Sequence, residues 1–194
     1  MILKHLTIKN RGGVAKLLSY LHHSPDRLRD AEGKSFAIRH NLRGDSPDSW
    51  IQEYLDNEEG RLTLRSDSVF MNHVIISFHA DDREQLSQEI LQDIAQKYID
   101  LAAQDALVVA VPHHDRDHLH VHLAISGIDC FEGKSLRMSQ ADFAQTKEKL
   151  QDYQREKYPE LEHSIVEHGR SKKKDLSDSK NQRSDELLEP RRKR

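Results

Sequence analysis

The 194-residue chain is long enough for one domain of ordinary size, and its composition excludes several classes of protein. Hydrophobic residues make up 36% and charged residues 32% of it, with a formal net charge of −3. Its apolar runs fall well short of the ~20 residues that a membrane helix requires. The single cysteine, Cys130, excludes an internal disulfide framework and suits a reducing compartment, so we expect a cytoplasmic protein.

The first elements along the chain are a strand and an amphipathic helix. Residues 1–9 have the pattern of a strand, and residues 13–22 place four apolar side chains on one helical stripe: Val14, Leu17, Leu18 and Leu21. Tyr20 lies roughly 110° from the centre of that stripe, so its hydroxyl should be reachable rather than buried in the core. Residues 24–46 contain Pro25, Gly33 and Gly44 among many charges and read as a long connection, a type of segment that is often functional.

The rest of the chain predicts alternating helices and strands. These are, in chain order, a short helix from about Pro47 capped by Ser46, a strand over 69–78, a helix over 82–104, strands over 106–112 and from 118 onward, a helix over 139–158 capped by Ser139, and a short closing strand over 161–168. This order predicts an α+β fold with a central antiparallel sheet flanked by helices. The strands near 106 and 118 should pair as a hairpin.

The last residues differ in composition from the domain before them. From Arg170 to Arg194 there are ten Lys/Arg against five Asp/Glu, a balance of +5, with few apolar residues and no sustained period. We therefore expect one domain over residues 1–168, followed over 169–194 by a basic, disordered tail or the start of a linker.

Residues 111–122, VPHHDRDHLHVH, hold five histidines and two aspartates in twelve positions. Strand alternation places His118, His120 and His122 on one face, with Leu119, Val121 and Leu123 on the other. The aliphatic face should be buried, and the imidazole face should line a site. A solvated strand face would be expected to carry Lys and Glu instead.

A divalent metal is the first chemistry that this pattern favours. Two histidines two residues apart, with Cα atoms ~6.6 Å apart, can hold one ion, whereas a third in the same row lies ~13 Å from the far one. The third ligand should therefore come from elsewhere, and His113 is the best supplier beside His120 and His122. Asp115 would then hold an imidazole by its second nitrogen. Three imidazoles favour Mn²⁺, Zn²⁺, Ni²⁺ or Co²⁺ over Mg²⁺.

Two other interpretations of the histidines stay open at this point. HLHVHLA fits the H-φ-H-φ-H-φ-φ pattern of the histidine-triad nucleotide hydrolases, whose middle histidine would be His120. That interpretation leaves His113, Asp115 and Tyr20 without a role. The other is structural, with histidines capped by acidic neighbours on an exposed strand.

Taken together, three segments resemble the motifs of the P-type mobilisation relaxases within the HUH endonuclease superfamily. KHLTIKNRGGVAKLLSYL is similar to the first motif, NHVIISF to the second and HHDRDHLHVH to the third, and IDCFEGKSLRMSQADF resembles the family's continuation downstream of the third motif. The resemblance covers about residues 1–168. An asparagine is common in this family where His118 stands, which leaves His118 as a further candidate ligand or a DNA contact.

The resemblance implies a relaxase that nicks and rejoins one DNA strand at an origin of transfer and so initiates plasmid mobilisation. It implies Tyr20 as the nucleophile that forms a 5′-phosphotyrosine, with His22 or His23 as the alternative. It also implies that Ser77 helps to hold the DNA and that a divalent ion assists, Mn²⁺ or Mg²⁺ being the expected ions. A free tyrosine, with a pKa of ~10, is a poor nucleophile at neutral pH, so Tyr20 needs either the metal-bound site or Asp115, acting as a base through a histidine, to activate it. The implied partners are single-stranded or locally melted DNA and accessory relaxosome proteins, in a bacterial cytoplasm. A non-catalytic origin-binding module is the non-enzymatic alternative.

Overall fold

The computed structural model describes residues 1–23, 28–29, 32–33, 36–114 and 118–166. Its strands are β1 (Ile2–Ile8), β2 (Ile38–His40), β3 (Met71–Ser77), β4 (Ala106–His113) and β5 (His120–Asp129). Its α-helices are α1 (Arg11–His22), α3 (Pro47–Glu59), α4 (Gln88–Ala102) and α5 (Gln140–Lys157), and two 3₁₀ helices are η1 (Ala80–Asp82) and η2 (Glu162–Ser164). Among these described residues, no helix combines the length and the apolar character needed to cross a membrane.

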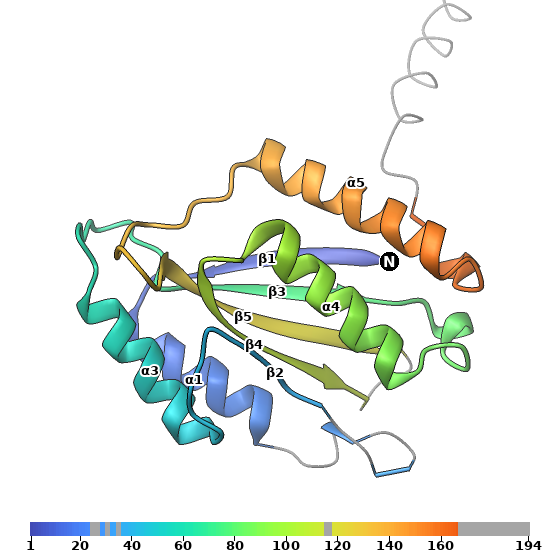
Figure 1. The fold of residues 1–194 in the computed structure, drawn as a ribbon, viewed down its shortest axis with the longest axis horizontal. Helices are drawn as coiled ribbons and strands as arrows, with labels where there is room; N and C mark the ends of the chain where they lie inside the picture. The colour runs from blue at the N-terminus through green and yellow to red at the C-terminus, as the bar shows by residue number, and fades with distance from the viewer. Residues whose placement is uncertain (24–27, 30–31, 34–35, 115–117, 167–194) are drawn as a thin grey trace, which may run out of the picture.

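The strands form a five-stranded sheet in the order β1-β3-β5-β4-β2, and each neighbouring pair is antiparallel. This confirms the predicted α+β class and the hairpin of β4 with β5. Helix α4 crosses the sheet on the side toward the viewer in Figure 1, while α1 and α3 pack against each other and both contact β5. The sheet is therefore packed between two sets of helices.

The two faces of the sheet bury different clusters. On the face toward α4, Val121, Leu123 and Ile125 of β5 pack with Val74 and Ile76 of β3 in a core that α4 and α5 complete. On the other face, α1 and α3 cover a smaller cluster built from Val14, Leu17, Leu18, Leu21, Trp50, Tyr54, Met71, Leu107, Val109, Val111 and Ala124. Strand alternation assigns the histidines of β5 to this second face.

Local signals explain most element boundaries, and three predictions need correction. Ser46 and Ser139 cap α3 and α5 as expected, each in a capping box. The helix predicted over 82–104 begins only at Gln88, because Ser87 accepts a hydrogen bond from Ile90 N and caps it there. Strand β2 lies inside the connection predicted over 24–46. The closing strand predicted over 161–168 is wrong for residues 161–166, which contain η2; residues 167–168 lie outside the described part.

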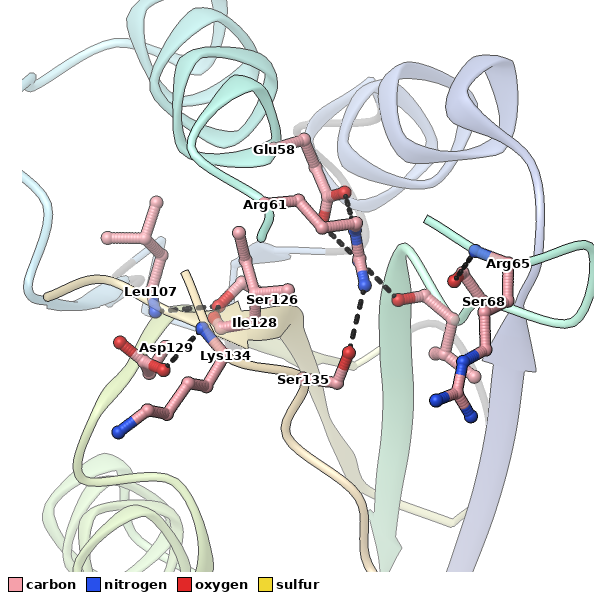
Figure 2. Close-up of polar contacts among 11 residues, drawn as sticks. Glu58, Arg61, Arg65, Ser68, Leu107, Ser126, Ile128, Asp129, Lys134 and Ser135 are labelled. Atoms are coloured by element: carbon pink, nitrogen blue, oxygen red, sulfur yellow. Dashed lines mark hydrogen bonds and ion pairs between the residues drawn. The ribbon is translucent and has the colours of Figure 1, made fainter. Parts of the chain in front are cut away.

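A buried polar cluster fixes the sheet at the carboxyl end of β5 (Figure 2). Glu58 and Arg61 form a two-bond ion pair at 2.8 Å whose side chains are each 4% exposed, and Arg61 also donates to Val69 O and Ser135 Oγ. Gly127 lies so close to Val69 that an added Cβ would meet its carbonyl oxygen at 1.9 Å. The segment before β3 and the end of β5 are thus held together without bulky side chains.

Candidate metal centre and tyrosine cleft

The amino end of β5 and the end of β4 bring three histidines together. His113 of β4 lies directly opposite His120 of β5, and His122 follows on the same face of β5. Each of the three offers one nitrogen, and these nitrogens all lie within 4.8 Å of one another. Ring centroids are 4.3 Å apart for His113 and His122, and 4.8 Å for His120 and His122. The residues predicted as metal ligands from the sequence therefore form one cluster.

One ring nitrogen of each of these imidazoles lies within hydrogen-bond distance of another group. His120 Nδ1 lies 3.0 Å from the carbonyl oxygen of His118, and His113 Nε2 lies 3.3 Å from that of Leu21. His122 Nδ1 lies 2.7 Å from His73 Nε2. An imidazole that donates one N–H to a fixed acceptor presents the lone pair of its other nitrogen in a set direction, which is the arrangement common in metal sites.

His73 on β3 is a member of the site that sequence reasoning missed. Its ring is stacked on that of His122, with 5.0 Å between centroids and 22° between planes. Burial, helped by His113 and Lys4, lowers the pKa of His73 to about 4, so the ring is neutral at pH 7. The Nε2 of a neutral His73 is able to accept a hydrogen bond from the N–H at His122 Nδ1. The signal was available, because alternation along NHVIISF puts His73 and Ser77 on one face.

Tyr20 projects from α1 over this cluster. Asn10 caps the helix, and Val14, Leu17, Leu18 and Leu21 are buried as predicted, while Tyr20 is 47% exposed. Its ring centroid lies 6.0 Å from that of His113 and 6.4 Å from that of His122, in both cases edge-on. The contact of His113 Nε2 with Leu21 O fixes α1 against β4 beside the tyrosine. Tyr20 therefore lies outside the core, as its position off the apolar stripe predicts.

His22, two residues after Tyr20 in α1, has a different environment from the tyrosine. The His22 ring packs against Trp50 with 4.5 Å between centroids. Burial, with a smaller effect of His113, lowers the pKa of His22 to about 4. His22 is therefore a neutral packing partner of Trp50 on the inner side of α1, whereas Tyr20 faces the cluster.

A cleft of about 470 Å³ opens above the cluster. Tyr20, His118, His120 and His122 line it together with Ser77, and its remaining walls come from Met1, Ile2, Ile75, Phe78, His79, His163, Ser164 and Val166. Ser77 is the last residue of β3 and pairs with both Ile2 and His120. Of the predicted site residues, Asp115 lies outside the described part of the chain. The structure brings the other five together in or beneath one cleft.

An antiparallel sheet that carries a histidine cluster beneath a helix-borne tyrosine is typical of the class of relaxase nuclease domains, which the sequence also resembles. Residues 20–158 match the family model described as relaxase, MobA/VirD2-like, nuclease domain. The chain belongs to this family. The matched residues include Tyr20, Ser77 and the whole histidine segment.

Known proteins and solved structures agree with this assignment. Two proteins from Escherichia coli, each named Protein TraI, are 28% and 25% identical to the chain over 135 residues, which is 66% of this chain. The match spans 17% of the length of either relative. Among solved structures, the MobM relaxase domain bound to plasmid pMV158 oriT DNA, with Mn bound, superposes with a TM-score of 0.59. It covers 93% of this chain and 98% of that one at 17% identity, a likeness of fold.

A second complex of the MobM relaxase domain, with a 26-nucleotide oriT DNA, gives a TM-score of 0.56 at 18% identity. It covers 87% of this chain and 95% of that chain. The sheet and helices described above thus make up nearly the whole of a known relaxase domain, which confirms the predicted fold.

Proposed function

We propose that this chain is the nuclease domain of a relaxase that nicks and rejoins one DNA strand at an origin of transfer, and so initiates mobilisation of a plasmid or related element. The observation that carries the proposal is the position of Tyr20, whose ring centroid lies 6.0 Å and 6.4 Å from those of His113 and His122, two members of the three-imidazole cluster. Membership of the relaxase family supports the same conclusion.

Tyr20 is the proposed nucleophile. Its Oη forms a bond to the scissile phosphorus as the bond from phosphorus to the 3′ oxygen breaks, which gives a 5′-phosphotyrosine and a free 3′ hydroxyl. The phenol proton leaves to a base, and a proton is returned to the 3′ oxygen. Asp115, acting through a histidine, is the proposed base. The covalent bond conserves the energy of the phosphodiester, so the reverse reaction rejoins the strand.

His113, His120 and His122 are the proposed ligands of a divalent cation. Their donor set fits such an ion, because three imidazole nitrogens lie within 4.8 Å of one another. One ring nitrogen of each imidazole also lies within hydrogen-bond distance of His118 O, Leu21 O or His73 Nε2, which orients the ring. Mn²⁺ is the ion in the similar MobM structure, and imidazole ligands favour it over Mg²⁺. Zn²⁺, Ni²⁺ and Co²⁺ also suit these ligands. When bound, the ion supplies Lewis-acid polarisation of the phosphate oxygens.

The other wall of the cleft suits a DNA backbone. Ser77 is half-buried at the end of β3 beside His120, so its hydroxyl is placed to donate to a phosphate oxygen. The substrate is single-stranded or locally melted DNA, since Tyr20 must reach a backbone freed from its partner strand.

We further propose that residues 1–168 are the nuclease domain and that residues 169–194 are a basic tail or linker. We also propose that the protein acts in a bacterial cytoplasm with accessory relaxosome proteins.

A denaturing gel tests the proposal. Labelled single-stranded oligonucleotides tiled across the DNA that flanks the gene are incubated with protein and Mn²⁺. Wild type should give a band shifted by the mass of the protein, and Tyr20→Phe or a chelator should abolish it. Tyr153→Phe is the matched control, because Tyr153 is a tyrosine of α5 whose hydroxyl donates a hydrogen bond to Asp93, and it should keep the band.

Three other outcomes would overturn parts of the proposal. An adduct that survives Tyr20→Phe would move the nucleophile to His22 or His23. Binding to one origin oligonucleotide without any adduct would identify a non-catalytic module. Hydrolysis of small nucleotides that depends on His120 and ignores Tyr20 would favour the histidine-triad interpretation.

A further inference from the structure

A second group of metal-binding side chains lies at the rim of the cleft, apart from the three-histidine cluster. His79, Asp81 and His163 each offer one ligand atom, and these atoms all lie within 4.8 Å of one another. His79 and Asp81 come from the turn after β3, and His163 comes from η2 beyond α5. The two segments are far apart in the sequence, so only the fold brings the three side chains together.

Hydrogen bonds hold the two segments that carry these residues together. His79 N donates to Ser164 Oγ at 3.0 Å, and His163 N donates to Asp82 Oδ1 at 3.2 Å. Ser164 and Asp82 are each 1% exposed, so each bond has one buried partner. These reciprocal bonds place the side chains of His79 and His163 next to each other, with 5.7 Å between ring centroids.

The side chains themselves are exposed and able to adjust. His79 Nδ1 lies 3.4 Å from Asp81 Oδ2, and these side chains are 48% and 64% exposed. Ligand atoms around a tetrahedral ion with bonds of ~2.0–2.1 Å are about 3.3 Å apart, so the group needs to close by roughly 1.5 Å at most. Rotation of exposed side chains on a fixed backbone supplies a movement of that size.

We propose that His79, Asp81 and His163 form a second divalent-metal site, distinct from the one beneath Tyr20. Two imidazoles and one carboxylate suit a late first-row ion, and Zn²⁺, Ni²⁺ or Co²⁺ bind such a set far better than Mg²⁺. Three protein ligands leave at least one coordination position for water or another oxygen ligand. A bound ion would connect the turn after β3 with the segment after α5, both of which contribute residues to the cleft.

Metal counting tests this site without reference to nicking. Protein stripped with a chelator is titrated with Zn²⁺ in competition with a chromophoric chelator of micromolar affinity, and the number of ions bound per chain is read from the absorbance. His163→Ala and Asp81→Ala should each bind one ion fewer than wild type. The double variant His120→Ala/His122→Ala should also lose one ion, and its combination with His163→Ala should lose two.

His40→Ala is the matched control, since His40 is a histidine of β2 that belongs to neither group of three. It should bind as many ions as wild type. Both His163 and Asp81 are exposed, so their variants should keep the circular dichroism spectrum of the wild type. An unchanged ion count in both His163→Ala and Asp81→Ala would overturn the site, and so would an equal loss in His40→Ala. Failure of the nicking assay leaves this count unaffected, so the two proposals are tested separately.

Discussion

The two ends of β5 use polar groups in opposite ways. At the carboxyl end, the Ser126 hydroxyl donates to Ile128 O and accepts from Leu107 N. Nearer the middle of the strand, the Tyr54 hydroxyl donates toward Leu107 O and Ala124 O and accepts from Val109 N. In every one of these bonds a polar group of the protein is satisfied by another group of the protein, as Figure 2 shows for Ser126. At the amino end, His120 and His122 offer nitrogens to a common point beneath an open cleft.

The difference indicates how a short domain holds a reactive site on a rigid support. A strand that is anchored at one end by internal bonds keeps its other end in register, so three imidazoles stay within a few ångströms without a covalent link. This contrast predicts that substitutions at the carboxyl end of β5 lower the stability of the fold. Substitutions at its amino end should lower metal binding and activity instead. Substitutions at the two ends should therefore separate these two effects.

The largest effect should come from the amino end. His122→Ala removes one proposed ligand from the centre of the cluster, and we expect nicking to fall on the order of 10³-fold, or about 4 kcal/mol of transition-state stabilisation. The metal affinity measured by calorimetry should fall with it. His40→Ala, on β2, is the control and should change neither quantity. Normal nicking by His122→Ala would remove this histidine from the site.

At the carboxyl end, Arg61→Met should cause the largest loss of stability. It leaves Glu58 buried without its cation, and breaking a buried pair costs about 3–5 kcal/mol. Arg11→Met is the matched control, because it breaks an ion pair with Glu59 whose side chains are 54% and 68% exposed, and such pairs contribute about 0–1 kcal/mol. Urea unfolding measures both. Equal losses for the two variants would contradict the view that the cluster in Figure 2 anchors the sheet.

The sequence predicted the amino end better than the carboxyl end. Strand alternation and the helical stripe placed His120, His122 and Tyr20 correctly, because both depend only on the spacing of nearby residues. The pairing of Glu58 with Arg61 and the approach of Gly127 to Val69 depend on tertiary contacts that no local period reports. Strand β2 was missed for a related reason, since three residues are too few to show an alternation.

The site was also predicted unevenly. The sequence predicts His113 as the third ligand, because a single row of histidines is too long for one ion. Its pairing with His120 across the hairpin agrees with that prediction. His73 was missed because one histidine in an apolar strand is usually a packing residue. The group of His79, Asp81 and His163 was out of reach, because its members come from segments that only the folded chain brings together.

A smaller effect at the amino end tests the role of His73. His73→Leu removes the acceptor beside His122 Nδ1 but leaves the three proposed ligands, so metal affinity should fall about 10–100-fold. His73→Gln, which keeps a hydrogen-bonding group, should recover part of the loss. Calorimetry gives the affinity, and urea unfolding of the metal-free protein shows whether stability changes as well. A loss of stability with unchanged metal affinity would make His73 a packing residue.

The smallest effect concerns the turn after β5 and its dependence on pH. Burial of the Asp129 carboxylate acts to raise its pKa, but bonds from the backbone N–H groups of Phe131, Glu132, Gly133 and Lys134 outweigh it, so the pKa lies below the usual 3.8. A carboxylate with a lowered pKa stabilises the folded state at neutral pH, and this contribution is lost as the pH falls through 3.8 toward the lower folded-state value. Asp129→Asn should therefore cost about 1 kcal/mol at pH 7. Urea unfolding at several pH values should show that the difference in the free energy of unfolding between Asp129→Asn and wild type narrows between pH 5 and pH 3. A difference that stays constant would mean that the charge of Asp129 does not stabilise the turn after β5.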